Sequence, residues 1–184
     1  MKSFDVRERL TLLLGGVVIL SAVSGCSLPF PVYSASGRNV EAIRNVPRAV
    51  KVGQFVGDQK SISCRLQPLE PQGGETFAAY IRNAFNEEII MAGAKTNEAG
   101  IGLNGTLKDI DVDCGILSAS WTIEMELSVG DRPPFTVKTI HNFDGNYFGA
   151  VVFSRAHAAF VPAIQHFIND VVKHPSFQAA GGKP

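Results

Sequence analysis

The stretch Ser120-Trp-Thr-Ile-Glu-Met-Glu-Leu-Ser-Val129 decides the fold, because its apolar and polar residues alternate without exception. Apolar side chains stand at every odd position from Trp121 onward, and polar side chains stand at the even positions. Successive side chains of a strand point to opposite faces, so this pattern predicts one buried face and one wet face. Such alternation is typical of an antiparallel sheet that is covered on one side only.

Further strands are predicted on both sides of this one. In residues 101–114 the apolar parity changes near Lys108 and Asp109, and a bulge there would return both apolar sets to one face. A Gly- and Pro-containing turn at residues 130–134 leads into a second alternating stretch, residues 135–143. Three strands with short connections predict an antiparallel meander.

Two amphipathic helices are predicted around the meander. Thr76 is a candidate N-cap for a helix that ends near Gly93, and a second helix should run from about Ser154 to Lys173. Pro162 lies inside the second helix, where it should cause a kink or a restart. Three charged residues of the first helix are expected on its wet side: Arg82, Glu87 and Glu88.

The first strand is predicted at Ala49–Phe55, with a continuation or a short extra strand at residues 62–66. The predicted fold is α+β, a two-layer sandwich of a mainly antiparallel sheet of about four strands against two helices, in the order β-α-β-β-β-α. We expect a single domain at residues 49–177 and a disordered tail at residues 178–184.

The N-terminus has the layout of an export signal. A basic start precedes Leu10–Val23, which holds 14 residues and no charge. This is shorter than the ~20 residues of a membrane-spanning helix, so a permanent short anchor is the weaker alternative. Val23-Ser24-Gly25-Cys26 resembles the lipobox of bacterial lipoproteins, which implies that residues 1–25 are a signal peptide and that Cys26 is acylated.

The lipobox resemblance also implies a location. Ser27 follows the acylated cysteine where the enterobacterial sorting rule places Asp for inner-membrane retention, so we expect an outer-membrane lipoprotein on the periplasmic face, bound to the membrane through Cys26. Residues 26–48 are rich in Pro, Ser and Gly and predict a flexible tether.

Cys64 and Cys114 remain once Cys26 carries lipid. Both lie on the apolar parity of their strands, and an exported domain meets an oxidising compartment, so we expect a disulfide. It would close a separation of 50 positions, worth about 4 kcal/mol in the chain-entropy model. Two free buried cysteines are the alternative.

The composition predicts few polar sites. With 17 basic and 17 acidic residues, the chain lacks the basic surface that nucleic-acid binding needs, and no catalytic, cofactor or metal site is predicted. The helical histidines His157, His166 and His174 should be surface or capping residues, and His141 a satisfied core residue. The acidic row Asp109, Asp111 and Asp113 fits a solvated strand face better than a calcium site.

The lipobox at Val23–Cys26 and the order of elements over Ala49–Pro175 resemble a group of small Gram-negative envelope lipoproteins. These are the YajG-type lipoproteins, the lipopolysaccharide-assembly lipoprotein, and the related amino-terminal domains of curli-secretion and TolB proteins. The resemblance implies an envelope role and supplies no catalytic residue.

Three functions follow as hypotheses. The leading one is a non-enzymatic accessory or scaffold subunit of an envelope assembly, with a protein partner in the envelope. The alternative is a binding module that holds an amphiphile or a peptide between the sheet and the helices. A hydrolase with a dispersed site is the third.

Overall fold

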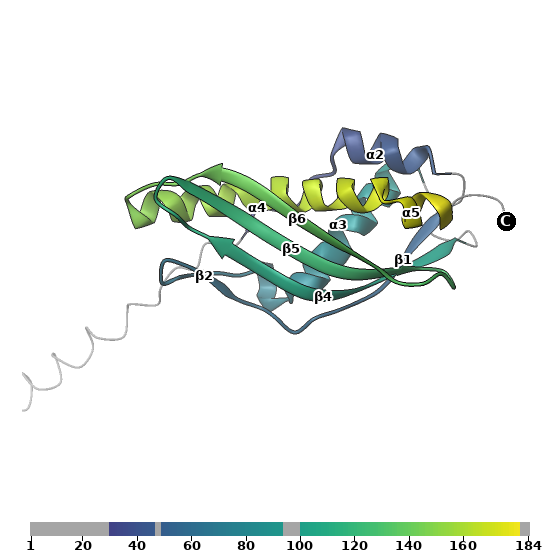
Figure 1. The fold of residues 1–184 in the computed structure, drawn as a ribbon, viewed down its shortest axis with the longest axis horizontal. Coiled ribbons are helices and arrows are strands. Elements are labelled where there is room, and N and C mark those ends of the chain that lie inside the picture. The colour runs from purple at the N-terminus through teal and green to yellow at the C-terminus, as the bar shows by residue number, and fades with distance from the viewer. Residues whose placement is uncertain (1–29, 47–48, 94–99, 181–184) are drawn as a thin grey trace, which may run out of the picture.

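The structure, a computed structural model, describes residues 30–46, 49–93 and 100–180. The described chain is α+β, as predicted, with a four-stranded sheet in the order β1-β4-β5-β6 (Figure 1). The strands of this sheet are β1 Val50–Val56, β4 Ile101–Asp113, β5 Ser118–Val129 and β6 Phe135–Asp144.

The predicted meander is present. β5 pairs with β4 on one side and with β6 on the other, both antiparallel. The β4–β5 register shifts between Leu107 and Asp109, where the bulge was predicted. Every odd residue of β5 is buried and every even one from Ser120 on is partly exposed, because the pleat sends them to opposite faces.

The sheet is mainly antiparallel, as predicted, but it is mixed because its edge pairing is parallel. β1 pairs with β4 in parallel, with Val50 opposite Ile101. The chain between them forms the helix α3, Phe77–Met91, which packs on β1 and returns the chain to the end where β1 began. A helical crossover of this kind produces parallel neighbours.

The segment between β1 and α3 forms a small hairpin. β2 Ile62–Cys64 pairs antiparallel with β3 Gln67–Leu69, and a short 3-10 helix, η2 Gln72–Gly74, follows. β2 lies within residues 62–66, where a continuation or a short extra strand is predicted. β3, one helix before β1 and one helix at the C-terminus are absent from the predicted order β-α-β-β-β-α, so the element order is corrected there.

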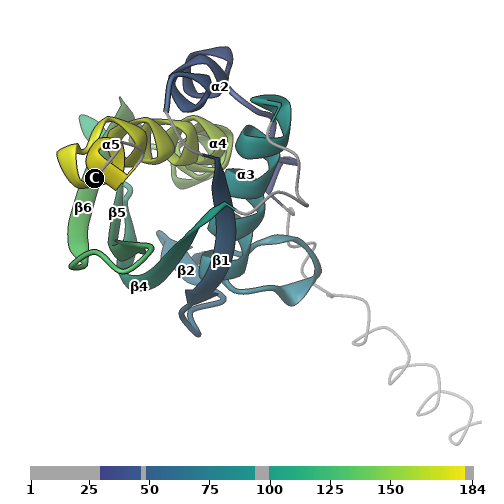
Figure 2. The same ribbon diagram turned by 90° about the vertical axis from the view of Figure 1, so that its right-hand side faces the viewer.

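The helices form a layer over one face of the curved sheet, as Figure 2 shows. α3 begins as predicted, with the Thr76 hydroxyl accepting from the Ala79 amide at 3.1 Å. α4, Gly149–Lys173, starts before the predicted Ser154 and continues through Pro162 as one helix. A third helix, α2 Gly37–Arg44, packs outside this layer on α3 and α4. No described helix combines the length and apolar character needed to cross a membrane.

The predicted tether at residues 26–48 is corrected over its described part, residues 30–46. Phe30 is fully buried, and its ring stacks on Phe160 with centroids 3.9 Å apart. Val40 and Ile43 of α2 are also buried. The segment holds few apolar residues, but nearly all of them share one packing surface, so its composition resembles a linker while its pattern does not.

The predicted boundary at the C-terminus also shifts. Residues 178–180, expected in a disordered tail, belong to the helix α5, Pro175–Ala180. Phe177 is buried, and the side-chain Nε2 of Gln178 donates to the Val172 carbonyl at 2.6 Å. The predicted tail from residue 181 onward lies outside the described residues, as do the predicted signal peptide and Cys26.

Candidate functional site

The interface between the sheet and the helices is filled by aromatic side chains. Trp121 is fully buried, and its indole N–H donates to the Ala156 carbonyl of α4 at 2.9 Å. Its ring packs against Phe160 and Phe30, with centroids 4.9 and 6.0 Å away. A ligand between sheet and helices would have to displace this packed core, so the candidate surfaces lie elsewhere.

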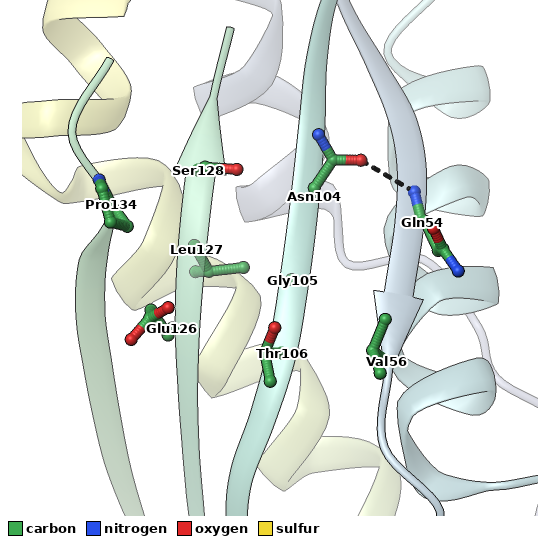
Figure 3. A pocket seen from close by; sticks show the side chains of 9 residues that line it. All are labelled: Gln54, Val56, Asn104, Gly105, Thr106, Glu126, Leu127, Ser128 and Pro134. Atoms are coloured by element: carbon green, nitrogen blue, oxygen red, sulfur yellow. Dashed lines mark hydrogen bonds between the residues drawn. The ribbon is translucent and has the colours of Figure 1, made fainter. Parts of the chain in front are cut away.

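The open face of the sheet carries a hollow of about 310 Å³ (Figure 3). Thr106 of β4 and Glu126 of β5 lie opposite each other in its floor. Side chains from β1, β4 and β5 and the loop before β6 line it: Gln54, Val56, Asn104, Gly105, Thr106, Glu126, Leu127, Ser128 and Pro134. The hollow is a mixed polar and apolar surface on a face that no described helix covers.

Asn104 shapes one wall of this hollow. Its side-chain oxygen accepts from the Gln54 amide at 2.9 Å, where the β1–β4 register shifts. A Cβ at Gly53 would stand 2.2 Å from that oxygen, so only glycine leaves room for the Asn104 side chain. The amide therefore fills the irregularity in β1 and fixes this wall.

Cross-strand ion pairs cover the same face. The Lys108 ammonium lies 3.2 Å from Glu126, and the Lys138 ammonium lies 3.0 Å from Glu124. All four side chains are partly exposed, so each pair contributes little stability and remains available to a partner.

The acidic row on β4 faces outward. Asp109, Asp111 and Asp113 are all exposed and lie along one strand face, opposite Glu124, Thr122 and Ser120 of β5. They do not converge, and the described residues include no group of three or more His, Cys, Asp or Glu side chains that could hold a metal ion.

The histidines separate into two kinds. His174 caps the end of α4, where its Nδ1 accepts from the Ser176 amide at 3.2 Å, and its ring stacks on Phe135. His141 of β6 and His166 of α4 face each other with ring centroids 5.8 Å apart. Burial, and then the neighbouring His166, lower the pKa of His141.

His141 and His166 belong to a polar pocket of about 540 Å³ between α2, α4 and β6. Six further residues complete its lining: Ser36, Arg38, Asn39, Pro162, Gln165 and Asn169. Within the described chain no hydrogen bond joins a serine hydroxyl to either histidine.

A buried polar cluster that the sequence does not predict adjoins this pocket. Glu88, predicted on the wet side of its helix, is fully buried. Its Oε1 accepts from the Tyr33 hydroxyl at 2.5 Å, the Ser36 amide at 2.9 Å and the Asn39 side chain at 3.1 Å. Burial, and then the hydrogen bond to Glu88, raise the pKa of Tyr33 far above its ordinary value.

The cluster ties three helices together. Asn39 of α2 also donates to the Gln165 carbonyl of α4 at 2.9 Å, and its oxygen accepts from Asn169 at 2.9 Å. Burying a polar group costs free energy unless it is hydrogen-bonded, and here the hydrogen bonds of Glu88 Oε1 and Asn39 fix residues 33–39 on α3 and α4. Helical periodicity cannot reveal the burial of Glu88, because its partners lie in residues 33–39, whose composition predicts a tether.

Cys64 and Cys114 are at disulfide distance. Their sulfurs lie 2.03 Å apart and their Cα atoms 5.6 Å apart, which fits the predicted pairing. The bond joins the β2–β3 hairpin to the loop after β4.

The comparisons with known proteins give no further guide. No family model matches this chain, and no curated protein is similar to it in sequence.

Proposed function

We propose that this protein is an outer-membrane-anchored periplasmic lipoprotein that serves as a non-enzymatic scaffold or accessory subunit of an envelope assembly. Acylation at Cys26 would supply the anchor. The Cys64–Cys114 pair supports an oxidising compartment. The resemblance to YajG-type envelope lipoproteins belongs to the same proposal.

The observation that carries the scaffold role is the open sheet face. One face of the sheet is covered by α3 and α4. The other face presents the hollow around Thr106 and Glu126 (Figure 3). It also carries two partly exposed ion pairs. The hollow combines polar side chains with the exposed apolar residues Val56 and Pro134, and such a mixture is typical of interfaces that form between separately folded proteins. The filled core favours this role over the amphiphile-binding alternative.

Acylation is tested by metabolic labelling with a fatty-acid analogue. We expect the label on the wild-type protein and none on the Cys26→Ala variant, which should accumulate as a precursor or outside the outer membrane. A Cys26→Ala protein that is still labelled would refute the anchor.

Partner binding is tested by placing a photo-crosslinking amino acid at Thr106, in the hollow, and at the exposed Glu41 of α2 as the matched control. We expect Thr106 to give one discrete adduct in cells that Glu41 does not give. A Glu126→Lys change, which reverses the charge beside Thr106, should abolish this adduct without altering acylation. Equal crosslinking at both positions would contradict the scaffold role of this face.

A further inference from the structure

A group of exposed apolar residues gathers at one end of the molecule, which we call the apolar tip. Leu66 and Leu117 are 97% and 94% exposed, and Phe148 is 68% exposed. The tip comprises six residues from three connections: Leu66, Ile116, Leu117, Tyr147, Phe148 and Val151. The connections are the β2–β3 turn, the β4–β5 loop and the entry to α4, at the left end of the domain in Figure 1.

The three connections are held together as one surface. The Cys64–Cys114 bond links the first to the second. The Arg65 guanidinium donates to the Cys114 carbonyl at 2.9 Å and to the Tyr147 carbonyl at 2.8 Å, so it spans all three. The Asn146 amide also donates to the Gly115 carbonyl at 3.3 Å. The exposed side chains therefore stand on a fixed platform.

Leu66 occupies an unfavourable position for its residue type. The β2–β3 turn has φ values of 46° at Arg65 and 71° at Leu66, and such two-residue turns ordinarily contain Asn or Gly. An almost fully exposed leucine in a left-handed conformation is explained neither by core packing nor by turn geometry. Its placement favours an apolar environment outside the protein.

The position of the N-terminal segment identifies that environment. Phe30 is fixed in the core, where its ring lies 5.5 Å from His157, and Gln72 after β3 donates to its carbonyl at 2.9 Å. Cys26 precedes it by four residues, which span at most about 14 Å. Acyl chains on Cys26 must therefore enter the bilayer close to Phe30.

The apolar tip is the end of the domain that lies nearer to this entry point. At the helical rise per residue, Val151 is about 9 Å from His157 along α4, whereas Lys173 is about 24 Å away in the opposite direction. A membrane within reach of Cys26 is thus closer to the tip than to the end that carries α5 and the β5–β6 turn. Tyr, Phe and Leu side chains are suited to the interfacial layer of a bilayer.

We propose that the apolar tip inserts into the phospholipid surface to which Cys26 attaches the chain. This inference rests on the proposed acylation of Cys26. It holds the domain end-on, with the long axis of α4 pointing away from the membrane and the open sheet face free along its side. Arg155 and Asp144 are both exposed beside the tip, so apolar contact, not net charge, carries the insertion.

The test uses the acylated full protein in vesicles of phosphatidylethanolamine and phosphatidylglycerol. Cys26 is acylated and Cys64 and Cys114 are paired, so one added cysteine can be labelled alone. Leu117→Cys carries an environment-sensitive fluorophore at the tip, and Arg132→Cys carries the same fluorophore in the β5–β6 turn at the opposite end. Quenching by nitroxide-labelled lipids reports contact with the bilayer.

We expect several-fold stronger lipid quenching at Leu117→Cys than at Arg132→Cys, unchanged by salt. If both probes are quenched weakly and equally while the protein still co-floats with the vesicles, tip insertion is overturned and the lipid anchor is not. Protein without acyl chains would overturn both. A third outcome is that the Leu117→Cys probe becomes less accessible to aqueous iodide as the protein concentration rises, while nitroxide lipids do not quench it. This result would overturn the proposal and would show that the tip binds a second copy of the protein.

Discussion

Replacing Glu88 by Ala tests whether the buried polar cluster holds the N-terminal segment on the domain. The change removes the acceptor of three hydrogen bonds, but Asn39 keeps its bond to the Gln165 carbonyl. Two donors, the buried Tyr33 hydroxyl and the part-buried backbone amide of Ser36, are then left without this partner. At roughly 1–3 kcal/mol for each, the unfolding free energy should fall by about 2–6 kcal/mol.

The second carboxylate oxygen places the expected value in the lower half of that range. Glu88 Oε2 is buried without a hydrogen-bond partner among the described residues, so its removal offsets part of the loss. Glu88→Gln retains an oxygen for the three donors and should lose less than Glu88→Ala. The neighbouring Glu87, only partly buried, is the matched control, and Glu87→Ala should change stability by no more than about 0.5 kcal/mol.

The assay is urea unfolding followed by the fluorescence of Trp121, the single tryptophan, which contacts Phe30 and so reports on the same segment. Trypsin cleavage at Arg38 and Arg44 gives a local readout and should accelerate in Glu88→Ala. Equal stability losses for Glu88→Ala and Glu87→Ala, with unchanged cleavage, would refute the argument that the cluster fixes residues 33–39.

Three further predictions concern burial and pH. Ile123→Ala should cost about 2–5 kcal/mol in a urea melt because Ile123 is buried, whereas Glu124→Ala on the open face should cost at most about 1 kcal/mol. Because the pKa of Tyr33 is raised, the unfolded state loses a proton above about pH 10 that the folded state keeps, so stability falls as pH rises. Tyr33→Phe should reduce the slope of unfolding free energy against pH by about 1.4 kcal/mol per pH unit. The lowered pKa of His141 means that the unfolded state binds a proton before the folded state does, so stability falls as pH drops below about 6.5. His141→Gln should reduce this loss of unfolding free energy in urea melts at successive pH values.

The meander was predictable because its information is local. The alternation of apolar and polar residues in β5 predicts its buried and exposed faces, and the change of parity in β4 predicts the bulge between Leu107 and Asp109. Thr76 and the apolar spacing of α3 likewise act within one helical turn. Each of these signals is complete within a few consecutive residues.

The features that were missed depend on contacts between distant segments. The parallel pairing of β1 follows from the crossover through α3 and not from the composition of β1. Glu88 is buried because Tyr33, 55 positions earlier, supplies a hydroxyl to it. The Pro, Ser and Gly content of residues 26–48 predicts a linker. It contains no information on the contacts that the Phe30 ring makes with Trp121 and Phe160, which are distant in the sequence.

The packed N-terminal segment changes what an anchor at Cys26 would do. A flexible tether over residues 26–48 would let the domain explore on the order of 25 Å from the membrane. With Phe30 fixed in the core, four residues remain and their full extension is about 14 Å. With such an anchor, the domain would stay close to the membrane, so the open sheet face would meet proteins that stand on or in the same membrane. The apolar tip and the sheet face then have separate tasks, because the first fixes the orientation in which the second is presented.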